Sequence, residues 1–165
     1  MRPRLTIKIV ALAAFWATVL AAVPARADGL PTSRSCNNWL IRGTYGFTIE
    51  GNKLGGPGPI GPQVGVAMTV FDGHGNLKQL DSVTVAGTTV ADFTHPVASG
   101  TYQVNPDCTG TFTINFTDGR PTVNTSFVLV EAGWEIDAVV TSVGPPGAEV
   151  QGLIATRSIG KRRVF

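Results

Sequence analysis

The sequence is poor in charged residues and in the patterns that helices need. Only 15% of its 165 residues are Asp, Glu, Lys or Arg. Leucine and lysine are scarce, whereas glycine, threonine and valine are common. No stretch repeats its apolar residues with a helical period. This composition is typical of a protein built from β-strands.

Motifs for catalysis or cofactor binding are also missing. The sequence has no Gly-x-Ser-x-Gly, no phosphate-binding loop and no dinucleotide fingerprint. Its two histidines, His74 in a Gly-rich turn and His95 before a proline, have no other ligand types beside them. We therefore expect both to be exposed loop residues, and we expect neither a metal site nor a cofactor. The sequence leaves open whether the protein is an enzyme.

No apolar run is long enough to span a membrane. The longest, from Ile9 to Val23, has 15 residues, against the roughly 20 that a bilayer requires. Basic residues precede it, and the small-x-small sequence Ala25-Arg26-Ala27 follows it. This order favours a signal peptide over residues 1–27 rather than an uncleaved anchor. The mature chain would begin at Asp28, would be secreted or periplasmic, and would have no membrane span.

Loss of the signal peptide would change the sign of the net charge. Four of the 13 basic residues and none of the 11 acidic residues lie before Asp28, so the formal charge changes from +2 to −2. The whole-chain pI of about 8.7 therefore does not indicate a nucleic-acid partner. The only basic cluster, Lys161-Arg162-Arg163, is interpreted as a solvated C-terminal tail over residues 159–165.

The chain has only two cysteines, Cys36 and Cys108. In an exported protein two cysteines usually pair, and no Cys-x-x-Cys or adjacent histidine favours a redox or nucleophilic thiol instead. A disulfide would close a loop of about 70 residues, which the chain-entropy model values at roughly 4 kcal/mol.

Short β-forming segments separated by Gly, Asp, Asn and Pro predict an all-β, antiparallel meander. It would close into a small barrel of about eight strands, with a sandwich as the alternative. The predicted strands cover residues 43–50, 63–72, 76–86, 88–94, 99–104, 109–117, 121–131, 134–142 and 149–157. The predicted organisation is a signal peptide (1–27), a lead-in segment (28–42), a barrel domain (43–158) and the basic tail (159–165).

Two turns predict the register of the second half. Two-residue turns at Asp118-Gly119 and Ala132-Gly133 place an apolar set of side chains on one face, with the polar ones on the other. The predicted pairs are Ile114–Val123, Phe112–Thr125, Gly110–Phe127, Leu129–Ile136, Phe127–Ala138 and Thr125–Val140. The same register places Glu135 and Asp137 on the solvated face, and Glu131 on the inner face beside Trp134.

Other inward positions follow from alternation alone. Tyr45, Phe47 and Ile49 are predicted to point inward. So are Val64, Val66, Met68 and Val70, although Phe71 breaks their pattern. In the hairpin at Asn105-Pro106-Asp107, a turn with one extra residue would place Tyr102 inside, opposite Phe112.

The order and spacing of five segments resemble a known family. They are Cys36, LIRGTYGF from Leu40, VFDGHGNL from Val70, GTYQVNPDCTG from Gly100 and FVLVE from Phe127. The family comprises small exported bacterial proteins with an allene-oxide-cyclase-like barrel, and the resemblance spans about residues 36–158. It implies a calycin-like, eight-stranded barrel with an apolar lumen, and it carries over no catalytic residue. Gly43-Thr44-Tyr45 together with Arg157 also resembles the lipocalin pairing of an aromatic with a basic residue.

Three functions fit these features. The first is binding of a small apolar ligand in the lumen, with Tyr45, Phe47, Met68, Phe127, Glu131 and Trp134 as candidate ligand-binding residues. The second is a cyclase or isomerase that confines an apolar substrate. The third is a structural or surface-interaction barrel with a filled core. The Gly- and Pro-rich segments 54–62 and 141–149 are predicted to be surface loops, with a lid as the alternative. The oligomeric state is left open.

Overall fold

A computed structural model describes residues 35–164, and the predicted signal peptide lies outside them. The strands are β1 (Gly43–Lys53), β2 (Gly61–Phe71), β3 (Asn76–Val85), β4 (Thr88–Ala91), β5 (Ala98–Val104), β6 (Thr109–Asn115), β7 (Thr122–Val130), β8 (Glu135–Gly144) and β9 (Ile154–Arg162). Two short 3-10 turns are present, η1 (Asn38–Ile41) and η2 (Glu131–Gly133). Within the described range, no helix has the length and apolarity to cross a bilayer.

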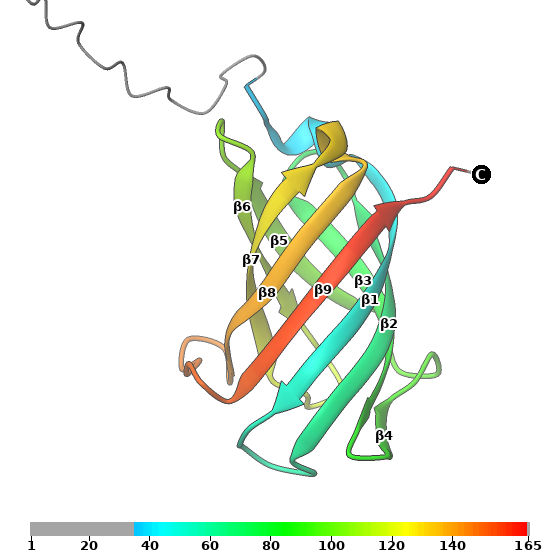
Figure 1. Ribbon diagram of the computed structural model, residues 1–165, viewed down its shortest axis with the longest axis vertical. Coiled ribbons are helices and arrows are strands. Elements are labelled where there is room, and N and C mark those ends of the chain that lie inside the picture. Colours follow the sequence, from blue (N-terminus) through cyan, green and yellow to red (C-terminus); the bar gives the residue numbers. More distant parts are fainter. Residues whose placement is uncertain (1–34, 165) are drawn as a thin grey trace, which may run out of the picture. The chain divides into compact units, whose positions relative to one another are not determined.

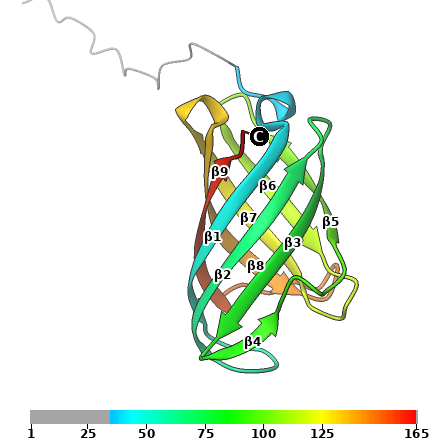
Figure 2. The same cartoon turned by 90° about the vertical axis from the view of Figure 1, so that its right-hand side faces the viewer.

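The strands form one antiparallel sheet that closes on itself. Their order is β2-β1-β9-β8-β7-β6-β5-β3-β4, and β2 also pairs with β3. Eight strands therefore make a closed barrel, while β4 pairs only with the C-terminal end of β3 (Figures 1 and 2). This confirms the predicted all-β barrel and excludes the sandwich.

The predicted register of the second half is confirmed. Ile114 pairs with Val123, and Phe112 pairs with Thr125. Leu129 pairs with Ile136, as the second turn required. The central hairpin has the expected extra residue, so Tyr102 pairs with Phe112 and is buried. Short turns and a one-sided apolar pattern were enough to predict these pairings.

The predicted orientation of β2 is wrong. Val64, Val66, Met68 and Val70 are between 44% and 59% exposed, and the residues between them face the interior. Phe71, the residue that broke the sequence pattern, is 1% exposed and marks the true inner face. Valine is favoured in strands on either face, so the apolar series did not identify the inside.

The last strand lies later than predicted. β9 covers Ile154–Arg162 instead of residues 149–157, so Lys161 and Arg162 belong to the barrel and not to a tail. Arg162 Nε donates to the Tyr45 hydroxyl over 3.0 Å, and its guanidinium also donates to the Leu40 carbonyl. Arg157, the residue suggested by the lipocalin resemblance, instead pairs with Glu50 on the exposed surface.

One end of the barrel is filled, and we call it the plugged end. Here η1 and η2 cover the barrel, and the predicted disulfide joins Cys36 to Cys108. Asn38 Oδ1 accepts from the Val104 amide over 2.7 Å, and the Tyr102 hydroxyl donates to the Asn38 carbonyl over 3.3 Å. These contacts fasten η1 to β5 and to the hairpin that follows it.

The β2–β3 turn at the plugged end gives a pH prediction. Hydrogen bonds from the side chain and then the backbone of Asn76 lower the pKa of Asp72 from 3.8 to about 2. A depressed pKa adds stability that is complete above pH 3.8 and is lost as the pH falls towards 2. We expect Asp72→Asn to unfold at lower urea concentration than the wild type at pH 7, and this difference to shrink between pH 4 and pH 2. A difference that stays constant across this range would contradict the assignment.

Candidate functional site

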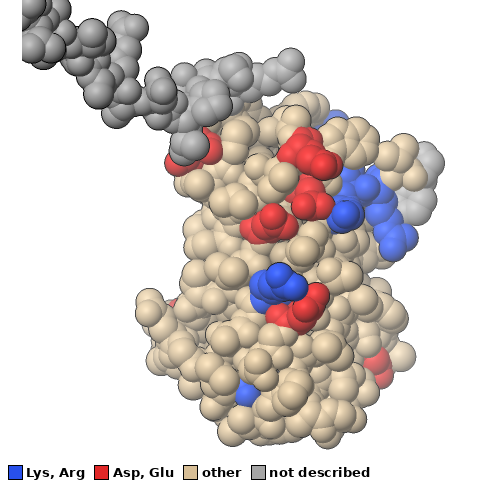
Figure 3. Space-filling model, in the orientation of Figure 1, with Lys and Arg blue, Asp and Glu red and all other residues tan. Residues whose placement is uncertain are grey.

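The other end of the barrel, which we call the open end, contains a cavity of about 440 Å³. We call it the lumen cavity. Six apolar side chains that line it are Phe47, Ile49, Val83, Val85, Ile114 and Val140. Six polar ones are Gln63, Gln79, Asp81, Arg120, Thr125 and Thr156. On the face that Figure 3 shows, charged side chains are sparse towards this end and gather nearer the plugged end.

Packed aromatic rings set the depth of the cavity. The Phe71 ring lies edge-on to Tyr45 at 5.5 Å and to Tyr102 at 4.9 Å, between ring centroids. Phe112 stacks on Phe127 at 5.7 Å and lies 6.4 Å from Phe47. Large side chains thus fill the barrel towards the plugged end. Towards the open end the inner face of β2 has Gly65 and Ala67 instead, which leaves space.

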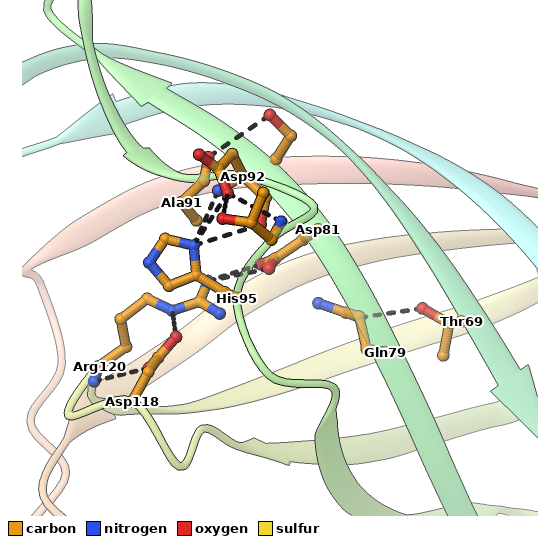
Figure 4. A network of polar contacts seen from close by, with 10 residues as sticks. Thr69, Gln79, Asp81, Ala91, Asp92, His95, Asp118 and Arg120 are labelled. Atoms are coloured by element: carbon orange, nitrogen blue, oxygen red, sulfur yellow. Dashed lines mark hydrogen bonds and ion pairs between the residues drawn. The ribbon is translucent and has the colours of Figure 1, made fainter.

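An ion pair lies on the cavity wall. Asp81, 5% exposed on the inner face of β3, accepts from Arg120 Nη1 at 2.9 and 3.1 Å (Figure 4). Arg120 Nε donates to Asp118 Oδ2 over 2.8 Å, and its guanidinium lies 3.8 Å from the centre of the Phe116 ring. Gly119, with φ of +88°, provides the left-handed turn between Asp118 and Arg120.

The ion pair occupies a gap in the strand ladder. β5 pairs with β3 only as far as Gln79, so Asp81 has no partner on β5. Arg120, from the loop between β6 and β7, reaches Asp81 across this gap. Burial raises the pKa of Asp118, but the hydrogen bonds and charge of Arg120 outweigh burial and hold that pKa below its usual value. Asp118 thus stays ionised behind Arg120.

Three further polar side chains, those of Thr69, Gln79 and Thr156, are buried in the barrel. The Thr69 hydroxyl donates to Gln79 Oε1 over 2.9 Å. Thr156 on β9 is only 6% exposed, and its hydroxyl oxygen is buried without a partner among the described residues. Buried polar atoms are nearly always hydrogen-bonded in folded proteins, so an unpaired one at a cavity marks a place for a ligand or a water.

The candidate residues from the sequence are only partly brought together. Phe47 lines the lumen cavity. Tyr45 and Phe127 are buried in the packed aromatic part of the barrel. Met68 lies on the outer face of β2, because the predicted orientation of that strand is wrong.

The prediction that Glu131 lies on the inner face, beside Trp134, is wrong. Strand β7 ends at Val130, and Glu131 and Ala132 take left-handed conformations with φ of 49° and 55° in η2. Glu131 is exposed and Trp134 is 49% exposed, at the plugged end and away from the lumen cavity. A two-residue turn gave the right register but not the path of the chain beyond the last pair.

Sequence reasoning missed Asp81, Arg120, Gln79 and Thr156. A signal for Asp81 was available, because it lies at an alternating position of β3 together with Leu77, Gln79, Val83 and Val85, all of which are buried. A carboxylate at an inward-facing position of a strand predicts a positively charged partner inside the barrel. Arg120 carried no signal, since its pairing with Asp81 depends on barrel closure.

Other titratable residues stay outside the cavity. His74 is exposed and lies edge-on to Trp39, and His95 Nδ1 lies 3.3 Å from Asp92 Oδ1 in an outer loop. Glu135 and Asp137 alternate with buried residues on the outer face of β8, but both are half-buried and Asp137 Oδ1 is buried without a partner among the described residues. Between residues 35 and 164, no group of three or more His, Cys, Asp or Glu could hold a metal ion.

No family model matches the chain, and no curated protein matches it either. The resemblance to exported barrels of the allene-oxide-cyclase-like kind therefore stays a prediction.

Proposed function

We propose that this barrel binds a small, largely apolar molecule in the lumen cavity. The supporting observation is the cavity itself, about 440 Å³ and mainly apolar, in a barrel that is filled at one end only. Ligand pockets of proteins commonly measure about 300–1,000 Å³ and combine apolar walls with a few polar groups. A structural barrel with a filled core would have no such space, so this alternative is less well supported.

The open end offers the route of entry. Pro57, Gly58 and Pro59 of the β1–β2 loop line the cavity, and the Lys53 ammonium donates to the Pro57 carbonyl in that loop. The predicted surface loop therefore lies at the cavity rim, where a lid would lie. The disulfide fits an oxidising compartment, and we include secretion or a periplasmic location in the proposal.

One observation favours a cyclase or isomerase as the second candidate. The Asp81 carboxylate lies at the wall of an apolar cavity, where a carboxylate can exchange a proton with a confined substrate. Turnover would require that a ligand copurifying with the protein is converted by the wild type and left unconverted by Asp81→Asn. If the same unaltered ligand is recovered after incubation with either protein, the enzyme hypothesis is contradicted and ligand binding is the remaining function.

Ligand binding can be tested with N-phenyl-1-naphthylamine, an apolar dye that fluoresces in apolar sites. We expect the wild type to enhance its fluorescence in a saturable way. Ala67→Phe places a ring in the lumen beside Phe47, its partner across β1 and β2, and is expected to weaken dye binding at least about tenfold.

The matched control is Met68→Phe, one residue along β2 and on the outer face. It adds an aromatic ring to the same strand but not to the cavity, so dye affinity should stay within about twofold of the wild type. Equal loss of affinity in both variants, or no saturable binding by the wild type, would contradict a lumen site.

A further inference from the structure

The charges at the lumen cavity compensate one another. Among the described residues, the charged side chains that line it are Lys53, Asp81 and Arg120. Asp118, which does not line the cavity, forms an ion pair with Arg120. These four carry two positive and two negative charges. Arg120 is paired with both carboxylates, and Lys53 is held at the rim by a carbonyl. Lys53 at the rim is therefore the one lining charge without an ion-pair partner among the described residues, and deeper in the lumen both carboxylates are paired with Arg120.

A ligand with a charged head would bring an uncompensated charge into this space. Moving a charge from water to an apolar site is costly unless a partner is waiting for it, and breaking a buried pair to provide one is costly too. The wall around Asp81 and Arg120, where the charges are paired, therefore selects against both carboxylate and ammonium groups. A neutral molecule escapes both costs.

The polar atoms still retain hydrogen-bonding capacity. Both Asp81 oxygens accept from a single nitrogen, Arg120 Nη1, although a carboxylate can accept about four hydrogen bonds. Arg120 uses Nη1 for Asp81 and Nε for Asp118, which leaves its Nη2 group for a ligand. One site on the wall therefore has a donor and an acceptor side by side.

A hydroxyl group matches this arrangement, because it can donate to the carboxylate and accept from the guanidinium at once. A carbonyl could use only the guanidinium. Thr156 supplies a second polar contact from β9, which β1 and β2 separate from β3. Its hydroxyl oxygen is buried and has no hydrogen-bond partner among the described residues.

We propose that the molecule bound in the lumen cavity is electrically neutral and hydroxylated, with its hydroxyl on the Asp81–Arg120 pair and a further contact to Thr156. This inference rests on the proposed ligand-binding function and narrows it to neutral apolar alcohols. It makes the polar atoms of the wall determinants of specificity.

The first test uses three probes of equal chain length, 1-octanol, octanoate and octylammonium, which compete with bound N-phenyl-1-naphthylamine at pH 7. We expect 1-octanol to displace the dye from the wild type at about tenfold lower concentration than either ion, which corresponds to about 1.4 kcal/mol. Equal or better displacement by an ion would overturn the inference while leaving the lumen site intact. Failure of the dye to bind would instead contradict the proposed function.

Charge variants provide the second test. Asp81→Asn leaves Arg120 with only one carboxylate partner, Asp118. We therefore expect the ratio of octanoate affinity to octylammonium affinity, measured by dye displacement, to rise at least about tenfold. Arg120→Gln should shift the ratio the opposite way. Glu50→Gln is the control, because its carboxylate pairs with Arg157 on the exposed surface. An unchanged ratio in both lumen variants, with native far-UV circular dichroism, would overturn the assignment.

Thr156→Val tests the second contact without a change of shape. One hydrogen bond is worth roughly 1 kcal/mol, so 1-octanol affinity should fall about fivefold, with dye affinity retained. Thr111→Val, on the outer face of β6, is the control and should change neither affinity. Equal loss for dye and alcohol would indicate a general change of the cavity and would contradict the contact.

Discussion

Replacement of Phe71 by alanine is expected to lower the free energy of unfolding by about 3–5 kcal/mol. The Phe71 ring lies between Tyr45 and Tyr102, at 5.5 and 4.9 Å between centroids, and 6.4 Å from Phe112. Its removal leaves a cavity inside a closed barrel, where the neighbouring rings cannot collapse without bending strands. Urea unfolding followed by far-UV circular dichroism measures the effect.

The adjacent residue is the matched control. Val70 is on the same strand but 44% exposed, so Val70→Ala should cost less than about 1 kcal/mol. Together the two variants test the orientation of β2. If Val70→Ala were more destabilising than Phe71→Ala, Val70 would face inward as the sequence pattern predicted, and Ala67 would not line the lumen.

Loss of the disulfide is the second large effect. Cys36 and Cys108 are 72 residues apart, and replacement of both by serine should cost about 4 kcal/mol in the chain-entropy model. The bridge fastens the segment before β1 to the β5–β6 hairpin, where the Cys36 amide also donates to the Pro106 carbonyl over 3.2 Å. Urea unfolding of the double variant, compared with the oxidised and reduced wild type, measures the cost.

The same double variant separates stability from binding. The disulfide lies at the plugged end and the lumen cavity at the open end, so dye affinity under native conditions should be unchanged. If the variant lost stability and affinity together before unfolding, the two ends would be coupled. A cost below about 1 kcal/mol would show that the unfolded chain gains little freedom from breaking the bridge.

The sequence carried good information about strand pairing wherever turns are short. Asp118-Gly119 and Ala132-Gly133 leave few possible registers, and only one places Phe112, Ile114 and Phe127 on a common face. The extra residue before Cys108 could be inferred in the same way, because Tyr102 would otherwise have faced water. Local turn chemistry and burial of aromatic rings agree in this half of the chain.

The lumen was poorly predicted because its inner face is not uniformly apolar. Gln63, Gly65 and Thr69 face inward on β2 while valines face out, so a rule that places apolar residues inside gives the reverse. The Asp81–Arg120 contact joins residues 39 positions apart through closure of the barrel. No local motif encodes such a contact, and it was absent from the sequence-based candidates for that reason.

The location of the tryptophans has a consequence for spectroscopy. Trp39 lies in η1 beside Arg42, and Trp134 packs near Arg162 next to η2, both at the plugged end. Trp16 belongs to the predicted signal peptide. Emission from the two indoles of the barrel would report the state of this end and remain silent when a molecule enters the other. A screen that relied on tryptophan quenching would therefore record true ligands as inactive.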